Sequence, residues 1–108
     1  MNEKLIGLLG IARRAGRLQT GFEATVTAVK SGDARLMLCA GDVSEKTRKE
    51  WRFATKDALP LTSLPLDKTA LGRALGAPRP VGLVAVCDEG FARAMRAHIP
   101  DTKEEQTI

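Results

Sequence analysis

Two almost uninterrupted apolar segments, residues 34–40 and 81–87, constrain the fold of this chain more than any other feature. The first contains Leu36-Met37-Leu38-Cys39 and the second contains Leu83-Val84-Ala85-Val86. A strand with one solvated face alternates polar and apolar residues, so an unbroken apolar run is typical of a strand that is covered on both faces. The two runs therefore predict the inner strands of a sheet that has helices on both sides.

Five segments with helical periodicity surround these strands. They begin near residues 2, 21, 45, 67 and 88, and glycines at 16, 32 and 76 are expected to end the first, second and fourth. In the second helix, Phe22, Val26 and Val29 are expected to face the core. The residues predicted to cap the five starts are Asn2, Thr20 in a capping box with Glu23, Ser44 or Asp42 paired with Glu45, Asp67, and Asp88.

Short strands are expected at residues 17–20 and 59–64. The alternation of helices and strands predicts one α/β domain, a three-layer α/β/α sandwich around a small and mixed central sheet. No repeat, low-complexity stretch or linker interrupts the chain. Residues 1–100 are therefore expected to form the domain, and residues 101–108 an acidic, disordered tail.

The charge of the chain favours a polyanionic partner. Residues 1–100 carry 16 Lys and Arg side chains against 10 acidic ones, whereas residues 101–108 carry one Lys against three acids. A basic domain attracts nucleic acid through its long-range field. Charge alone does not separate such a domain from a soluble protein that has a few extra surface lysines.

The cysteines and the N-terminus exclude several classes of protein. Cys39 and Cys87 lie inside the apolar runs, and the chain has one His, so the spacing of a zinc site is missing. We expect two buried free thiols in a reducing compartment. The N-terminal apolar segment is too short to span a membrane and lacks a signal-peptide pattern. A cytoplasmic protein with no metal and no membrane contact is expected.

No segment has the pattern of an enzyme active site or of a cofactor site. A phosphate-binding Walker loop is absent, and Gly72, Gly76 and Gly82 are too widely spaced for a dinucleotide fingerprint. His98 is expected to be a surface or capping residue, and Asp88-Glu89 to begin a helix rather than act as paired carboxylates. The sequence therefore predicts a protein that is not an enzyme and that has no cofactor and no small-molecule substrate.

Two clusters of cations and one helix start could bind RNA. Arg13, Arg14 and Arg17 form a group without acids, and the helix expected after Ser44 carries Lys46, Arg48, Lys49, Arg52 and Lys56. Such groups can contact phosphates, although a plain solvated helix face explains the second group better than an RNA surface does. The helix start at Gly21 offers unpaired N–H groups and partial positive charge to an anion. An ordinary capped helix explains the same residues.

Five ordered segments resemble the superfamily of ribosomal proteins L7Ae and L30e, in particular its small bacterial YlxQ-type members. The resemblance covers most of residues 5–95. The segments are Leu8-Leu9-Gly10-Ile11-Ala12-Arg13-Arg14-Ala15-Gly16-Arg17-Leu18, Gly21 with Gly32, Leu36-Met37-Leu38-Cys39-Ala40-Gly41-Asp42-Val43-Ser44, Leu71-Gly72-Arg73-Ala74-Leu75-Gly76, and Val84-Ala85-Val86-Cys87-Asp88-Glu89-Gly90-Phe91-Ala92.

The resemblance implies recognition of a kink-turn or a similar bent RNA. In this family, the start of the second helix enters the kink and the loop after the fourth helix closes over it, reading splayed bases and backbone shape. The corresponding segments here are residues 21–27 and 77–81. The RNA-binding residues expected on this basis and from the cationic clusters are Arg17, Gly21, Phe22, Glu23, Thr27, Asp42, Lys46, Arg79 and Pro80.

This chain departs from the family motif within the second helix. The motif typically reads Gly-x-Asn-Glu-x-x-Lys. Gly21 matches it, but Glu23, Ala24 and Thr27 stand where the motif has Asn, Glu and Lys. The changes bring a negative charge toward phosphates and remove a base-edge acceptor and a cation. A lost bidentate base contact costs about 1–3 kcal/mol of discrimination, so kink-turn recognition is expected to be weak or altered.

Two functions follow from the sequence. The first is an RNA-binding accessory protein of translation or ribosome assembly, whose partner is a structured RNA, with ribosomal RNA as one candidate. The second is a protein-interaction module on the same fold, whose RNA face has decayed and whose partner is a translation or transcription factor. A small-molecule enzyme would need a convergent polar pocket, and the sequence does not indicate one.

Overall fold

The two apolar runs form the inner strands of a four-stranded sheet. In the computed structural model of the chain, which describes residues 3–99, β2 (Leu36–Cys39) pairs antiparallel with β4 (Leu83–Val86). β1 (Leu18–Thr20) pairs antiparallel with β4, and β3 (Leu61–Ser63) pairs parallel with β2. The order β1-β4-β2-β3 confirms a small mixed sheet, and its inner strands are buried at every position.

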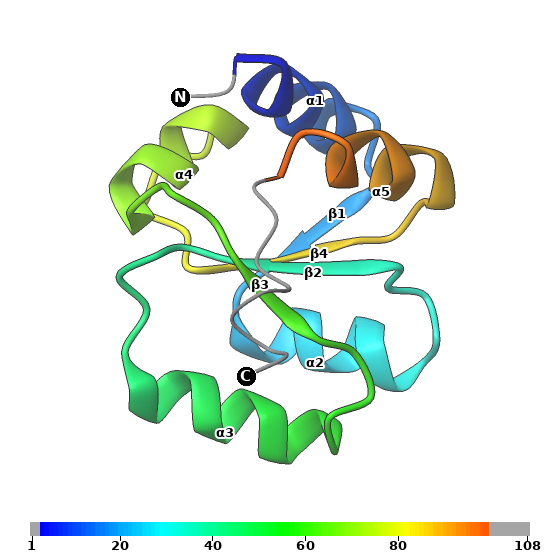
Figure 1. Cartoon of the computed structure of the whole chain (residues 1–108), viewed down its shortest axis with the longest axis vertical. Coiled ribbons are helices and arrows are strands. Elements are labelled where there is room, and N and C mark those ends of the chain that lie inside the picture. The colour runs from blue at the N-terminus through cyan, green and yellow to red at the C-terminus, as the bar shows by residue number, and fades with distance from the viewer. Residues whose placement is uncertain (1–2, 100–108) are drawn as a thin grey trace.

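Helices cover both faces of this sheet, as the sequence predicts. Two lie below it in the view of Figure 1 and three lie above it, which gives the three layers of an α/β/α sandwich. The lower helices are α2 (Phe22–Lys30) and α3 (Glu45–Thr55), and the upper ones are α1 (Glu3–Arg14), α4 (Lys68–Leu75) and α5 (Glu89–Arg96). None of the helices described is long and apolar enough to cross a membrane.

Three of the predicted helix caps are confirmed. The side chains of Ser44, Asp67 and Asp88 accept hydrogen bonds from backbone N–H groups three residues later, at 3.1, 2.8 and 2.8 Å. Such a bond satisfies one N–H group that has no partner within the helix. Asp42 does not cap α3, because its carboxylate accepts instead from the backbone N–H of Lys68 at 2.9 Å.

The predicted capping box at the start of α2 is wrong. Thr20 is the last residue of β1 and pairs with Val84, so it lies one residue too early to cap the helix. The N-cap is Gly21, which has a φ of 98° and makes no side-chain capping bond. The prediction failed because the positive φ at Gly21 allows the chain to pass from strand into helix through this single residue, so Thr20 stays in the strand.

Phe22, Val26 and Val29 all pack in or against the core, as predicted, and two further residues of α2 are buried with them. Val29 is buried, but Phe22 and Val26 are only half-buried, and the other buried positions are Thr25 and Ala28. The fully buried Thr25 hydroxyl donates to the Gly21 carbonyl at 2.7 Å and accepts from the Trp51 indole N–H at 3.0 Å. A polar residue can therefore occupy this core position because both of its hydrogen-bonding roles are filled.

The two ends of the chain lie outside the described residues. The cap predicted at Asn2 and the acidic tail predicted at residues 101–108 fall there. His98 follows the end of α5 and is half-buried.

Candidate nucleic-acid interface

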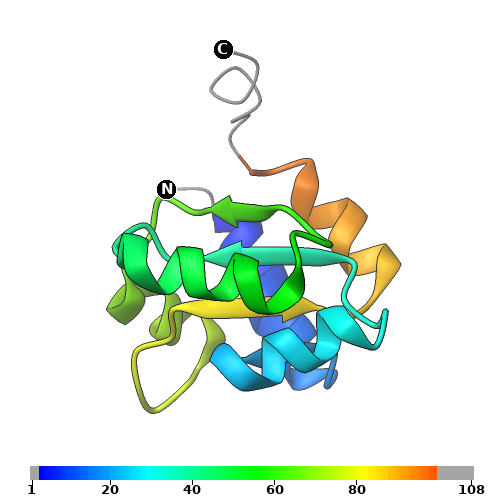
Figure 2. The ribbon, with the colours of Figure 1, turned by 90° about the horizontal axis from the view of Figure 1, so that it is seen from below.

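Three connections meet at one end of the sheet, which we call the Gly21 end. They are the turn at Gly21 between β1 and α2, residues 40–44 between β2 and α3, and residues 76–82 between α4 and β4. The Gly21 N–H donates to the Leu83 carbonyl at 3.0 Å, and the Ala40 N–H donates to the Gly82 carbonyl at 2.9 Å. Figure 2 shows the start of α2 beside the loop that precedes β4.

The first turn of α2 presents its N–H groups without a side-chain cap. The helix ladder begins with the Thr25 N–H donating to the Gly21 carbonyl at 3.1 Å. Among residues 3–99, no side chain accepts from the N–H groups of residues 22–24. Unpaired N–H groups and the positive end of the helix dipole together favour an anion such as phosphate.

Gly72 holds the loop after α4 against its helix. A β-carbon at this buried glycine would overlap the Arg79 carbonyl oxygen. The Val81 N–H fixes the far side of the loop by donating to the Lys68 carbonyl at 3.0 Å. Gly72 lies in one of the segments that resemble the family, but nothing in the neighbouring sequence shows that a loop packs against it.

Six of the nine expected RNA-binding residues lie at the Gly21 end. Gly21 and Phe22 begin α2, Asp42 lies in the connection before α3, and Lys46 lies in the first turn of α3. Arg79 and Pro80 are exposed in the loop that Gly72 supports. The topology thus gathers residues separated by up to 59 positions in sequence.

The remaining three expected residues line an open groove that runs along α2 away from Gly21. The groove has a volume of about 730 Å³, and Arg17, Glu23 and Thr27 contribute to its walls. Arg17 lies beside Cys87 at the other end of β1, and its guanidinium is 3.9 Å from the Asp88 carboxylate. The other lining residues are Gly16, Gln19, Ala24, Ala28, Ser31, Asp33 and Cys87.

Charge in this groove is mixed. The cation of Arg17 faces two acidic side chains, Glu23 and Asp33, along the same walls. Cys87 was expected to be buried but is half-buried there. Burial, with a smaller contribution from the Asp33 carboxylate, raises the pKa of the Cys87 thiol above its ordinary value. Burial likewise raises the pKa of the fully buried Cys39.

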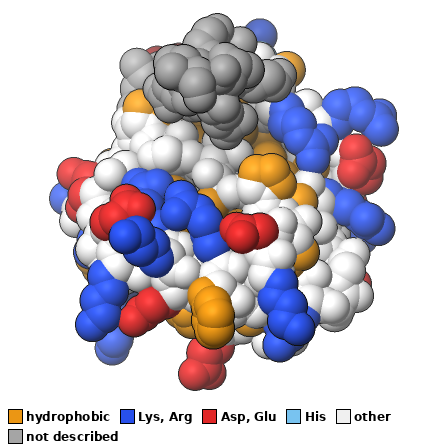
Figure 3. Space-filling model, turned by 60° about the horizontal axis from the view of Figure 1, so that its bottom comes forward, with side chains coloured by type: hydrophobic (Ala, Val, Ile, Leu, Met, Phe, Trp, Pro, Cys, Tyr) orange, Lys and Arg blue, Asp and Glu red, His pale blue; other side chains and the backbone are white. Residues whose placement is uncertain are grey.

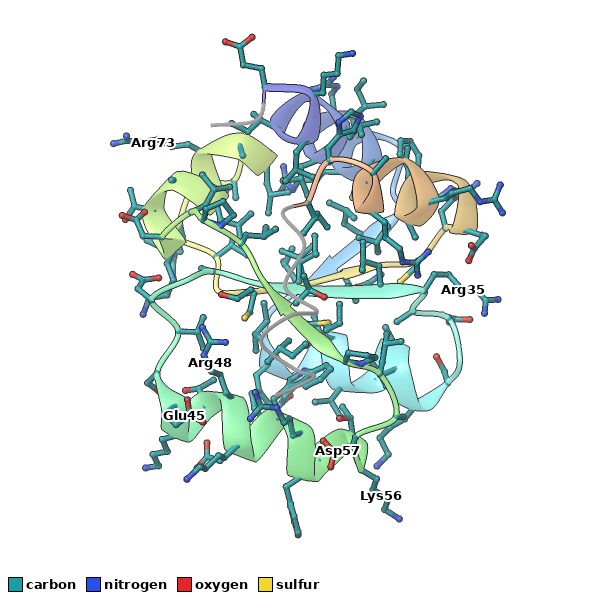
Figure 4. All side chains as sticks on the ribbon, in the orientation of Figure 1. Arg35, Glu45, Arg48, Lys56, Asp57 and Arg73 are labelled. Atoms are coloured by element: carbon teal, nitrogen blue, oxygen red, sulfur yellow. The ribbon has the colours of Figure 1, made fainter. Side chains whose placement is uncertain are left out.

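Two of the arginines in the cationic clusters support the fold. Arg13 donates to the carbonyls of Leu75 and Gly76 at 3.2 and 3.4 Å, which satisfies the end of α4. Arg48 donates to the carbonyls of Val43 at 3.1 Å and of Ala40 and Gly41 at 3.4 Å. Figure 4 shows its side chain turned from α3 toward the connection that follows β2. These roles could not be predicted from the sequence, because the fold brings the carbonyls within reach of the two arginines.

The sequence of this chain matches a known protein family. Residues 3–96 match the model of the "Ribosomal protein L7Ae/L30e/S12e/Gadd45 family". The chain is similar to a protein named RNA-binding protein YlxQ from Enterococcus faecium, with 32% identity over 95 residues. That match covers 84% of this chain and 86% of the relative.

Solved structures share the fold. A protein from Bacillus halodurans described as having unknown function superposes with a TM-score of 0.80 at 32% identity, over 91% of this chain and 98% of that one. A 15.5 kD RNA-binding protein from Giardia lamblia superposes with a TM-score of 0.70 at 20% identity, over 100% of this chain and 93% of that one. This chain therefore belongs to the ribosomal protein L7Ae/L30e/S12e/Gadd45 family.

Proposed function

We propose that the protein binds RNA through its Gly21 end, as an accessory protein of translation or ribosome assembly. The RNA it recognises is bent or kink-turn-like. The start of α2 enters the bend, and the loop at Arg79 and Pro80 closes over it. The family membership and the names of similar proteins support this proposal.

The observation that carries the proposal is the contrast among helix starts. Ser44, Asp67 and Asp88 each cap a helix, whereas Gly21 leaves the first N–H groups of α2 without a side-chain partner. Gly21 also carries no side chain that would keep an RNA backbone away. The loop held by Gly72 supplies a cation, Arg79, near the same place.

The side chains that depart from the family motif predict weak affinity for a standard kink-turn. Glu23, Ala24 and Thr27 all face the groove along α2. A carboxylate there repels phosphates, Ala24 offers no acceptor to a base edge, and Thr27 brings no positive charge. Recognition by this chain therefore depends more on the backbone of α2 and less on its side chains.

A titration of kink-turn RNA against two forms of the protein tests the proposal. The first form is the natural chain, and the second carries Glu23→Asn, Ala24→Glu and Thr27→Lys together. We expect the natural chain to bind at low salt and the altered chain to bind at least about tenfold more tightly, because a bidentate base contact is worth about 1–3 kcal/mol. Absence of binding by both forms at low salt would overturn the proposal.

The salt dependence of binding tests the role of the loop. Each phosphate contact by a cation contributes about one unit to the slope of log affinity against log salt. Arg79→Gln should weaken binding and reduce the slope by about one unit. Arg17→Glu, in the groove away from Gly21, should weaken binding only if the RNA extends along α2. If the slope of log affinity against log salt is unchanged in Arg79→Gln, the loop does not contact the RNA.

The mixed charge of the groove favours a second candidate, a protein-interaction module. Glu23 and Asp33 line this groove together with Arg17, and a peptide with both charge signs fits such walls better than a phosphate backbone does. The partner would be a translation or transcription factor. Capture of such a factor that persists after ribonuclease treatment, together with no binding to RNA, would favour this candidate.

A further inference from the structure

The outward face of α3 carries a line of residues that starts at Lys46, at the Gly21 end, and continues beyond the proposed interface. Lys46, Lys49 and Phe53 are spaced by three and four residues, so they share one face of the helix, and Lys56, the C-cap residue, follows Phe53 by three positions. We call these four residues the α3 stripe. All four are exposed, and the stripe is about 15 Å long at the usual helical rise.

Phe53 is the most exposed large apolar side chain among residues 3–99. Its side chain is 86% exposed, whereas Ile11 is 49% exposed and the other two phenylalanines are half-buried. The neighbouring Trp51 is fully buried, so the helix turns one aromatic side chain inward and the other outward. Exposure of a phenyl ring to water opposes the hydrophobic effect, and it therefore contributes nothing to the stability of the isolated domain.

The lysines of the stripe make no ion pair with any described residue. Elsewhere on α3, Arg52 pairs with Glu45 at 3.9 Å and Arg48 is bonded to backbone carbonyls. Figure 3 shows basic side chains gathered over this side of the molecule, with acidic ones among them. The acids next to the stripe in sequence are Glu45, Glu50 and Asp57, of which Glu45 pairs with Arg52, so the three lysines lie beside two acids for which no ion pair is seen among residues 3–99.

We propose that the α3 stripe is a second contact surface, which binds unpaired RNA by stacking a base on Phe53. The three lysines contact the phosphates on either side of that base. Stacking on an exposed aromatic ring combined with a basic track is how proteins hold single-stranded nucleic acid without reading its sequence. The proposal deepens the proposed function, because it adds a site for single strands beside a site for bent RNA.

The position of the stripe suits this role. Lys46 lies in the first turn of α3, which follows directly from the connection at the Gly21 end. Lys56 lies at the far end of the helix, where Figure 4 shows its side chain directed away from the domain. A single strand that leaves an RNA bound at the Gly21 end can therefore follow α3 along its lysines.

The same features argue against an apolar partner. The apolar surface of one phenyl ring surrounded by lysines is far smaller than the area of about 800 Å² that each partner buries in a stable protein interface. Two copies of the stripe placed face to face would also bring like charges together. A flexible polyanion with flat bases matches both the ring and the charges.

The test uses an unstructured oligouridylate of roughly a dozen nucleotides, titrated at low salt. We expect Phe53→Ala to weaken binding at least fivefold or so and Phe53→Leu to weaken it nearly as much, because leucine keeps apolar volume but has no aromatic face. Phe53→Trp should preserve binding, and its fluorescence should be quenched on addition of the oligonucleotide. Ile11→Ala, which removes the other large apolar side chain that is exposed among residues 3–99, should bind normally.

A second pair of variants isolates the contribution of charge. Lys49→Gln and Arg73→Gln each remove one exposed cation, the first from the stripe and the second from α4, whose arginine points away from the domain in Figure 4. Lys49→Gln should reduce the salt slope by about one unit, and Arg73→Gln should leave it unchanged. Equal effects of the two variants would mean that net charge alone attracts the RNA, which overturns the proposal.

Other outcomes identify a different occupant. Competition by polyglutamate as strong as that by the oligouridylate would show that the stripe recognises an acidic chain, and self-association abolished by Phe53→Ala would show that a second copy covers it. Either result overturns the proposal, as does binding by Phe53→Ala equal to that of the natural chain.

The proposals for the two RNA sites can be disproved independently of each other. If kink-turn binding is absent but oligouridylate binding depends on Phe53, the proposal that the Gly21 end binds RNA is wrong, and the proposal that the α3 stripe binds RNA is supported. If kink-turn binding is present and Phe53→Ala binds the oligouridylate normally, the reverse holds.

Discussion

Helices α2 and α3 pack side by side beneath the same sheet, yet they offer opposite surfaces to solvent. The exposed side of α2 has an uncapped start and then Glu23, Ala24 and Thr27, with no cation before Lys30. The exposed side of α3 starts at a capped serine and carries three free lysines around Phe53. The comparison teaches that α2, the helix of the proposed kink-turn site, offers mainly backbone groups, whereas α3 offers cationic and aromatic side chains.

A buried hydrogen bond joins the two helices despite this difference. The indole N–H of Trp51 in α3 donates to the hydroxyl of Thr25 in α2, and that hydroxyl donates to the carbonyl of Gly21. The position of the uncapped turn therefore depends on a side chain of the neighbouring helix.

The largest expected effect comes from breaking this link. Trp51→Ala should lower the free energy of unfolding by about 3–5 kcal/mol, since it opens a cavity and leaves Thr25 without its donor. Thr25→Val should cost about 1–3 kcal/mol, because the indole N–H would stay buried without an acceptor. Urea unfolding followed by far-ultraviolet circular dichroism measures both, and it does not need the chain's one tryptophan.

Phe53→Ala is the matched control on the same helix. Its ring is exposed, so the free energy of unfolding should change by no more than about 0.5 kcal/mol. A loss comparable to that of Trp51→Ala would show that Phe53 packs in the domain, and the assignment of the stripe as a binding surface would then be wrong.

The next effect in size concerns the loop that closes over α2. Gly72→Ala should cost about 1–3 kcal/mol and displace the loop at Arg79, because the added methyl group overlaps a backbone carbonyl. Gly7→Ala, at an exposed position of α1 with nothing within 4 Å, should instead stabilise the domain by about 0.5–1 kcal/mol. Thermal unfolding measures both variants, and kink-turn titration should be weakened only in the first.

A swap of one cation between the helices tests the comparison directly. The double variant Thr27→Lys/Lys49→Thr keeps the net charge while moving a lysine from α3 to α2. We expect kink-turn affinity to rise and oligouridylate affinity to fall, with the two salt slopes changing by about one unit in opposite directions. Unchanged slopes would mean that the RNA does not distinguish the two surfaces.

The smallest effect is a difference in chemical labelling. Cys87 lies in the groove along α2, and burial raises the pKa of its thiol above the ordinary value of 9.0. Its thiolate is therefore scarce at neutral pH, and alkylation by iodoacetamide should accelerate as the pH rises through and beyond 9. Bound kink-turn RNA that extends along α2 should slow the reaction, and oligouridylate on the α3 stripe should not.

The architecture was predictable from the sequence because its signals are local. The apolar runs predicted the inner strands. Three helix starts were predicted from Ser44, Asp67 and Asp88, because each of these caps bonds to a residue only three positions away. The family resemblance, confirmed by the comparisons, supplied the candidate interface.

The features that position the candidate site were not predictable from local signals. Thr25 and Trp51 are 26 residues apart, and Asp42 bonds to a backbone N–H 26 residues away. The cap at Gly21 was missed because the sequence places Thr20 and Glu23 in the spacing of a capping box, whereas the pairing of Thr20 with Val84 in the sheet removes it from that role. In each of these cases, a hydrogen bond or strand pairing between residues far apart in sequence determines the local structure.

The division of α2 into two faces bears on how proteins of this kind diverge. Thr25, Ala28 and Val29 carry the packing of the helix, whereas Glu23, Ala24 and Thr27 line an open groove. Substitutions at exposed positions change stability little, so the groove residues are nearly free of the constraint that folding imposes on their neighbours. Under the proposed function, three substitutions in this groove would alter the preferred RNA while the protein stays folded, which would give selection a short path between RNA targets.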